Sequence, residues 1–217
     1  MEFTKQDLQD LKHTQILTQN DKMRKTSKEN NIRLYNFGIT AYKSHSTGKV
    51  TCPFAKDCIK FCYARKGSFI WTNTKKAYEK RYLLTKEIDL FKSKMNEAIK
   101  RRKASHIRIH DSGDFYNFAY INIWLQIMRE NKNVIFYAYT KSKILFDRLR
   151  KIDIPENFTI IYSLGSKNDE LINQKKDRHS KIFESETELL KAGYINASKN
   201  DLIAISKDSH KIGLIIH

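Results

Sequence analysis

Short apolar runs and amphipathic segments alternate along the second half of the chain. Runs of strand type occupy His106–His110, Asn133–Tyr139 and Phe158–Leu164, and polar residues follow each of them. After the first run, apolar residues recur at helical spacing on one face: Ile121, Trp124, Ile127 and Met128. Ser142–Lys151 has the pattern of a further helix. Apolar strands joined by amphipathic crossovers are typical of a parallel sheet.

The first half of the chain has a looser pattern. Residues 1–31 are polar with weak helical spacing, which predicts a polar N-terminal arm. Ile32–Ala41 has the pattern of a strand, Ser44–Gly67 that of a loop, and Thr72–Lys103 that of helical structure. Thr85 is a candidate cap for a second helix within this last span.

The C-terminal part completes the predicted domain. Ser185–Glu188 forms a capping box and Gly193 a helix stop, and Leu202–Ser206 and Lys211–Ile216 are predicted as two closing strands. Residues 32–217 are therefore expected to form a single α/β domain. Its mainly parallel sheet of about five or six strands would be an open sheet or an incomplete barrel. In both arrangements, functional groups gather at the C-terminal ends of the strands.

The three cysteines, Cys52, Cys58 and Cys62, stand within eleven residues in the pattern Cys-x5-Cys-x3-Cys. No apolar run approaches the ~18–20 residues of a membrane helix, and the first residues lack a signal-peptide pattern. We therefore expect a cytoplasmic protein without membrane association, in which thiols stay reduced and disulfides do not form. Three neighbouring thiols in a polar, lysine-containing loop predict a metal centre.

Two metals compete for the cysteine triplet. Three thiolates suit a [4Fe–4S] cluster that leaves one iron open. Zinc prefers four ligands, so a zinc site would need a histidine such as His45, His106 or His110. A metal-free thiol site and three buried structural cysteines are the remaining interpretations. The sequence favours the cluster, because it lacks the second cysteine pair that zinc sites often use.

Four segments of the chain stand out as motifs: CPFAKDCIKFCYARKG (52–67), RIHDSGDFYN (108–117), FYAYTKS (136–142) and KIGLIIH (211–217). They resemble motifs of a group of phage and prophage proteins, the gene-product-88 family. The cysteine loop also resembles that of radical-SAM enzymes, although its spacing departs from their usual Cys-x3-Cys-x2-Cys. The resemblance, over residues 30–217, implies a phage protein with a radical-SAM-like partial (β/α) barrel. Many family members carry further cysteines in the C-terminal third, whereas this chain has none after Cys62.

The radical-SAM resemblance implies a cofactor as well as a cluster. In such enzymes the open iron chelates S-adenosylmethionine, and an electron from a donor cleaves the sulfonium to give a 5′-deoxyadenosyl radical. Phe61 occupies the place of the aromatic residue that packs on adenine. Gly113 and Asp114, with Ser112 beside them, loosely match the Gly-Gly-Glu motif that holds the methionine amino group. The structural alternative for Asp114 is an N-cap on a helix beginning near Phe115.

Further candidate groups stand at the ends of the predicted strands. Thr140 and Ser163 could bond a ribose or a carboxylate, and Lys141 an anion. His110 and Asp111 are candidates for acid–base chemistry. Structural alternatives exist for these residues too: a helix cap, a solvated lysine and, for His110, a core-edge histidine bonded to the backbone.

The formal net charge of +17 at pH 7 extends this picture to partners. It favours a nucleic acid or another polyanion, the alternative being a solvated lysine-rich surface. The leading hypothesis is a radical-SAM-like iron–sulfur enzyme of phage or mobile-element origin that modifies such a substrate in the cytoplasm of an infected host, with an electron donor that the sequence does not identify. The alternatives are a zinc-stabilised nucleic-acid-binding module without catalysis, and a virion or host-interaction protein with a degenerate site.

Overall fold

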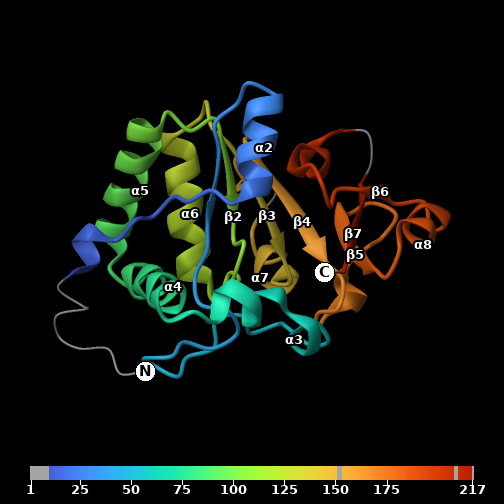
Figure 1. The fold of residues 1–217 in the computed structure, drawn as a ribbon, viewed down its shortest axis with the longest axis horizontal. Helices are drawn as coiled ribbons and strands as arrows, with labels where there is room; N and C mark the ends of the chain where they lie inside the picture. Colours follow the sequence, from blue (N-terminus) through green and yellow to red (C-terminus); the bar gives the residue numbers. More distant parts are fainter. Residues whose placement is uncertain (1–9, 151–152, 208–209, 217) are drawn as a thin grey trace.

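The computed structural model describes residues 10–150, 153–207 and 210–216 (Figure 1). At its centre is a seven-stranded sheet in the order β1-β2-β3-β4-β5-β7-β6, in which neighbouring strands are all parallel. The sheet curves into a half-barrel. The predicted α/β class, parallel sheet and partial barrel are confirmed, with seven strands in place of the expected five or six.

The elements are mostly short. The strands are β1 (Leu34–Phe37), β2 (His106–Ile109), β3 (Ile135–Thr140), β4 (Phe158–Ser163), β5 (His179–Phe183), β6 (Ile195–Asn196) and β7 (Lys211–Ile215). The α-helices are α2 (Asp21–Glu29), α3 (Cys58–Phe61), α4 (Thr72–Leu84), α5 (Ile88–Arg102), α6 (Phe118–Glu130), α7 (Lys143–Phe146) and α8 (Glu186–Lys191). The 3₁₀ helices are η1 (Asp10–His13), η2 (Tyr63–Arg65), η3 (Gly67–Ile70), η5 (Asp169–Leu171) and η6 (Asp201–Ile205).

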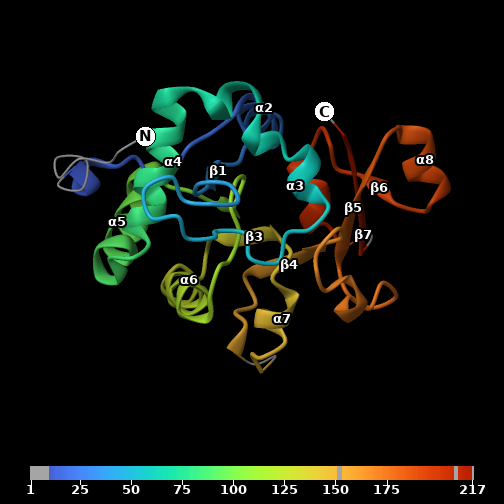
Figure 2. The ribbon, with the colours of Figure 1, turned by 90° about the horizontal axis from the view of Figure 1, so that it is seen from below.

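The outer face of the sheet packs against helices and forms the larger core. Successive residues of a strand point to opposite faces, so one set of alternating side chains meets α5 and α6. Phe37 and Ile109 are fully buried there, and Trp124 of α6 meets Phe37 edge-on, with ring centroids 5.3 Å apart. Figure 2 shows α5, α6 and α7 on one side of the central strands, with α2 on the other.

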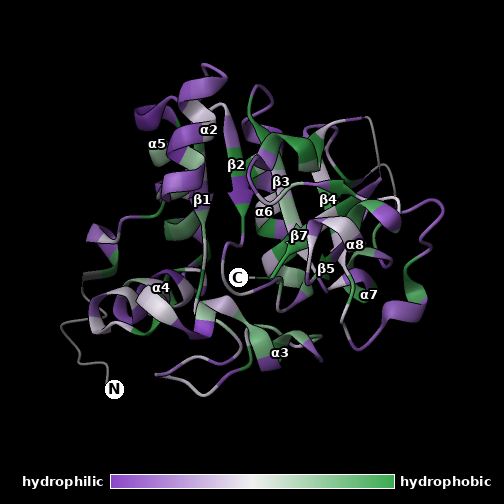
Figure 3. Ribbon diagram, turned by 45° about the vertical axis from the view of Figure 1, so that its right-hand side comes forward, coloured by the Kyte–Doolittle hydropathy of each residue, from purple (hydrophilic) through white to green (hydrophobic). Residues whose placement is uncertain are grey.

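The inner face of the half-barrel is covered by α2 and η6. Met23 of α2 and Ala204 of η6 join Tyr137 and Ile212 of the sheet in a second, smaller core. The side chain of Asn20 caps α2 by accepting a hydrogen bond from the Met23 N–H. In Figure 3 α2 is coloured mainly as hydrophilic and the central strands mainly as hydrophobic, as expected of a helix that buries few of its side chains.

The N-terminal segment packs on the domain. Leu11, Ile16 and Leu17 are buried in the larger core, and the Thr18 N–H donates to the Asn36 carbonyl at 2.9 Å in an antiparallel bridge to β1. Residues 1–9 of the predicted arm lie outside the described residues. Within the described ranges, every helix is too short or too polar to cross a membrane.

The C-terminal third departs most from the predicted elements. Leu202–Ser206, predicted as a strand, is largely the 3₁₀ helix η6, because the Asn200 side chain accepts from the Leu202 N–H and starts a turn. The sequence pattern predicts neither β5 nor β6 as a strand. In β5, buried and exposed residues do not alternate, so the usual signal of a half-buried strand is missing. The capping box is confirmed: the Ser185 side chain accepts from the Glu188 N–H at the start of α8.

Two predicted helix limits are also wrong. Thr85 ends α4 and does not cap α5, whose N-cap is Glu87. The helix expected over Ser142–Lys151 is the single turn α7, and Lys151 lies outside the described residues. His217, the last residue of one of the family-like motifs, also lies outside them.

Candidate functional site

The cysteine loop and the carboxyl ends of the strands enclose a cavity of about 180 Å³. This edge is where open parallel sheets commonly bind ligands. The residues that the sequence nominates for the cluster, the cofactor and catalysis all line this one cavity: Cys52, Cys58, Phe61, Cys62, His110, Asp111, Ser112, Gly113, Asp114, Thr140, Lys141 and Ser163. The fold therefore brings together groups that follow four different strands.

Cys52 is held by hydrogen bonds on both sides of its loop. The Thr51 hydroxyl donates to the Thr40 carbonyl at 2.6 Å, and the Thr51 carbonyl accepts from the Asp114 N–H at 3.2 Å. The Tyr42 N–H donates to the Cys52 Sγ at 3.3 Å. Cys52 is thus fixed between the segment that continues β1 and the turn that follows β2.

Cys58 is the first residue of the short helix α3 and Cys62 follows its last residue. The loop that carries this helix is joined to the far side of the cavity. Ala55 forms an antiparallel bridge with Ser166 in the turn after β4, and the Lys167 N–H donates to the Phe54 carbonyl at 2.9 Å. These bonds close the cysteine loop over the strand ends.

The thiols of Cys52 and Cys58 are poor acids in the chain by itself. Burial raises the pKa of Cys52, and the negative charge of Asp114 adds to this rise. Burial also raises the pKa of Cys58, and the positive charge of the Lys141 ammonium partly opposes this rise. Conversion of these thiols to thiolates therefore needs a compensating positive charge, which a bound metal supplies.

Asp114 ties the turn after β2 to the end of β3. Its Oδ1 accepts hydrogen bonds from the Thr140 hydroxyl at 2.6 Å and the Phe115 N–H at 2.7 Å, and its Oδ2 accepts from the Lys141 N–H at 2.9 Å. A carboxylate offers about four acceptor positions, so one is left for a ligand. Burial raises the pKa of Asp114, and these hydrogen bonds oppose the rise. The alternative role as a helix cap is wrong, because Asn117 caps α6.

Asp111 is a buried connector at the same turn. Its Oδ2 accepts hydrogen bonds from the Asn36 side chain and, at 2.8 Å, from the Tyr78 hydroxyl, and its carbonyl accepts from the Tyr63 hydroxyl. A Cβ on Gly38 would come within 1.8 Å of Asp111 Oδ1, so only glycine lets the carboxylate take this place. Asp111 therefore links β1, α4 and the residue after Cys62.

Gly113 and His110 adopt left-handed backbone conformations in this turn. Gly113 has φ +79°, and a Cβ there would meet the Ile39 side chain at 2.2 Å. His110 has φ +65°, and its ring packs edge-on against Phe115. Its Nε2 lies 2.9 Å from the Tyr120 hydroxyl, and burial lowers its pKa to about 3, so the imidazole stays neutral. This is a core-edge histidine, bonded to a side chain rather than to the backbone.

The remaining predicted groups are partly engaged with one another. The Thr140 hydroxyl donates to Asp114 and accepts from the Ser142 N–H at 3.0 Å. The Lys141 ammonium donates to the Leu164 carbonyl at 3.2 Å, and the Ser163 hydroxyl lies 3.2 Å from that of Ser180. Thr140 therefore positions Asp114, whereas Lys141 and Ser163 keep polar atoms at the cavity.

The structure adds residues that the sequence analysis missed: Tyr63, Arg108, Tyr139 and Ser180 also line the cavity. A second cavity of about 490 Å³ shares Phe61, Tyr63, Arg108, Asp111, Ile182 and Leu214 with the first. Together they reach the ~300–1,000 Å³ of a typical ligand pocket. Arg108 could have been found from the sequence, because it is a charged residue inside the predicted strand His106–His110.

The histidines considered as fourth zinc ligands lie apart from one another. His106 begins β2, away from the cysteine end, and its Nδ1 lies 2.9 Å from the Ser105 hydroxyl. His45 lines a separate cavity, so of the three only His110 reaches the cysteine cavity. Over residues 10–150, 153–207 and 210–216, no group of three or more His, Cys, Asp or Glu side chains is placed to hold a metal ion.

Comparisons with known proteins extend over most of the chain. The family model described as Gene product 88 matches residues 14–215. The Gene 88 protein of Mycobacterium phage L5 is 34% identical over 106 residues, which cover 42% of this chain and 43% of that protein. The match thus spans less than half the length of the curated relative. No solved structure matches the chain.

Proposed function

The chain belongs to the gene product 88 family, and from this premise we propose that Cys52, Cys58 and Cys62 hold a [4Fe–4S] cluster in a protein of radical-SAM type. One observation carries the proposal: three thiols from one short loop face a single cavity at the carboxyl edge of a parallel half-barrel. The polar ends of β2, β3 and β4 line the same cavity. A cofactor bound there would meet hydroxyl, carboxylate and ammonium groups together.

A cluster and a single ion require different arrangements of the thiols. A zinc ion needs its ligand atoms within about 2.3 Å of one point. In a [4Fe–4S] cluster each thiolate binds a different iron, so the sulfurs stand farther apart. The three thiols share a cavity, and the described residues contain no His, Cys, Asp or Glu group gathered for one ion. The hydrogen bond from the Tyr42 N–H to the Cys52 Sγ is of the kind that tunes clusters.

The residues around the thiols have distinct roles in this proposal. Asp114 would receive the methionine amino group of S-adenosylmethionine on its remaining acceptor position, and Thr140 positions Asp114. Ser163 offers a hydroxyl to the ribose or carboxylate, and Phe61 an aromatic surface to the adenine. When bound, the cluster supplies the electron, drawn from a donor protein, that cleaves the sulfonium. The charge of +17 makes a polyanion such as RNA or DNA the proposed substrate class.

Anaerobic reconstitution with iron and sulfide tests the cluster. We expect about four irons per chain and a brown protein with an electron paramagnetic resonance signal on reduction. Cys62→Ala should lose the signal, whereas the control His45→Ala should keep it, because His45 lines a different cavity. A wild-type protein that takes up no iron, or that holds one zinc in its place, would overturn the proposal.

Cofactor binding is tested on the same loaded protein. Addition of S-adenosylmethionine should change the resonance spectrum of the reduced cluster. Asp114→Asn should keep the iron content but weaken this response about tenfold, since one hydrogen bond to a charged donor is worth ~1.5 kcal/mol or more. A full response in Asp114→Asn would remove Asp114 from the cofactor site.

A further inference from the structure

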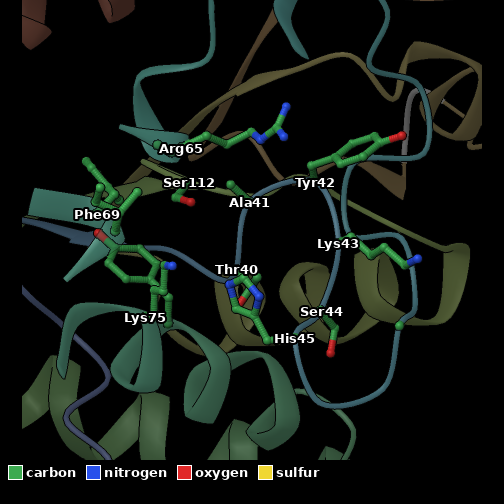
Figure 4. Close-up of a pocket in the computed structure, with 14 residues that line it drawn as sticks. Thr40, Ala41, Tyr42, Lys43, Ser44, His45, Arg65, Phe69, Lys75 and Ser112 are labelled. Atoms are coloured by element: carbon green, nitrogen blue, oxygen red, sulfur yellow. The ribbon is translucent and has the colours of Figure 1, made fainter. Parts of the chain in front are cut away.

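A larger cavity, of about 590 Å³, adjoins the cysteine cavity and is not used by the proposed cluster (Figure 4). Ala41, Ala64 and Ser112 line both cavities, so the two share a wall. The larger one is built from the loop after β1, from the segment 64–70 that follows the cysteines, and from α4. Figure 4 shows Arg65 and Tyr42 along one side of it, with Lys75 and His45 along the other.

The charge of this cavity has one sign. Lys43, Arg65 and Lys75 line it together with His45, and its lining, all of it described, includes no Asp or Glu. The acid behind it, Glu79, is fully buried and is engaged in holding the loop. Its carboxylate accepts hydrogen bonds from the hydroxyls of Thr40, Ser44 and Ser46. It also accepts hydrogen bonds from the backbone N–H groups of His45 and Ser46. Lys43, Arg65 and Lys75 thus have no acidic partner within the cavity.

Aromatic side chains are interleaved with these cations. Tyr42, Phe69 and Tyr78 line the cavity, and the Arg65 guanidinium lies 5.6 Å from the centre of the Tyr42 ring. Trp71, just after the segment that forms the wall, is 67% exposed. Tyr42, Phe69 and Tyr78 are half-buried. Half-buried and exposed rings beside cations that lack an acidic partner are the pattern of surfaces on which nucleic-acid bases stack while phosphates meet lysine and arginine.

We propose that this cavity binds single-stranded nucleic acid, with a base against Phe69 and Tyr42, the neighbouring phosphates on Lys43, Arg65 and Lys75, and Trp71 as an outer stacking surface. An unpaired strand is required, because a base in a duplex has no free face to stack on the rings. The binding itself does not need a metal. That the bound strand is the substrate rests on the proposed function, since the cavity shares a wall with the cysteine site.

Fluorescence anisotropy of a labelled oligothymidylate and a labelled oligouridylate of about 12 nucleotides tests the binding. The full chain is used both metal-free and after reconstitution. The double variant Lys43→Gln/Lys75→Gln should bind at least about tenfold more weakly, and its slope of log affinity against log salt should fall by about 1.4, or 0.7 for each lost phosphate contact. The matched control Lys100→Gln/Lys103→Gln removes the same charge from exposed positions at the end of α5 and should stay within about twofold.

A second variant separates stacking from charge. Phe69→Leu should weaken binding about tenfold with an unchanged salt slope, because base stacking contributes ~1–3 kcal/mol per base without releasing counterions. Bound strand should also quench the fluorescence of exposed Trp71, whereas Trp124, fully buried, reports that the variants are folded.

Three outcomes would overturn the inference: equal losses in the two double variants, tighter binding of a duplex than of a single strand, or displacement of the strand by poly-glutamate at equal charge concentration. Binding by the metal-free protein separates this inference from the cluster. A chain that binds the strand but takes up no iron refutes the proposed function alone, and a chain that takes up iron but binds no strand refutes the inference alone.

Discussion

The two faces of the sheet bury different chemistry. On the outer face, aromatic and aliphatic side chains such as Phe37 and Trp124 fill the larger core. On the inner face, the Lys22 Nζ lies 2.7 Å from Asp201 Oδ1, and the Arg108 Nη1 lies 3.4 Å from Asp201 Oδ2. Burial opposes ionisation of Asp201, yet the charges of Arg108 and Lys22 outweigh it and lower its pKa.

This difference separates stability from binding. Burial of apolar surface is the main favourable contribution to folding, whereas the attraction within a buried ion pair is largely offset by loss of hydration. The outer face therefore supplies most of the stability. On the inner face, Arg108 and Lys22 line the cavity of about 490 Å³, so their positive charges lie where a ligand in that cavity would meet them.

The largest expected effect lies on the outer face. Trp124→Ala removes a fully buried ring that packs against Phe37 and Phe91, and should lower the free energy of unfolding by about 3–5 kcal/mol. Urea denaturation measures this change. The matched control is the other tryptophan: Trp71→Ala, at a mostly exposed position, should change stability by less than about 0.5 kcal/mol. Similar losses in both variants would break the assignment of stability to the outer face.

A pH effect sharpens the comparison, because His110 is a titratable group packed into the aromatic core. Its folded pKa of about 3 lies below the ordinary 6.5, so on acidification the unfolded chain binds a proton that the folded chain refuses. The free energy of unfolding should fall between about pH 6.5 and pH 3, by up to about 5 kcal/mol. His110→Phe should remove this part of the acid sensitivity, and His45→Gln should not. If the stability of His110→Phe and that of the wild type fall equally on acidification, a group other than His110 binds the proton.

On the inner face, Asp201→Asn should lower the free energy of unfolding by about 2–3 kcal/mol, because the half-buried Lys22 and Arg108 then lose their counter-charge. Differential scanning calorimetry at neutral pH measures the loss. As a control, Asp153→Asn removes an acid from an exposed pair with Arg150 and should leave the transition temperature in place. If Asp201→Asn proves neutral, the inner face tolerates unpaired cations and its separation from the outer face is weaker than proposed.

The smallest effect is expected behind the basic cavity, where the buried Glu79 holds the loop that lines it. Glu79→Gln keeps the shape of the side chain but removes the negative charge that accepts hydrogen bonds from the loop. It should lower the free energy of unfolding by about 1–2 kcal/mol. Hydrogen exchange of the His45 and Ser46 amides should become faster, while amides of α6 keep their rates. Glu97→Gln, on the exposed face of α5, should change neither. Unchanged exchange at His45 in Glu79→Gln would show that other contacts hold the loop.

Much of the candidate site could be predicted because it depends on local pattern and on topology. Asp114, Thr140 and Ser163 follow three apolar runs, and in a parallel sheet the ends of such runs meet at one edge. The direction of a side chain at that edge could not be predicted. His110 turns towards Phe115 because its backbone is left-handed, and this conformation has no signature in the sequence HIRIHDSG.

The sequence by itself determined the parallel α/β fold, because the periodicity of apolar residues encodes it directly, and it indicated the family through motifs that resemble those of known members. The tertiary structure decided the rest. It paired Asp201, the first residue of the 3₁₀ helix η6, with Lys22 from the other end of the chain. It also assembled the basic cavity from the loop after β1, the segment after the cysteines and α4. Such contacts join residues far apart in sequence, and their energies depend on packing that no local pattern specifies.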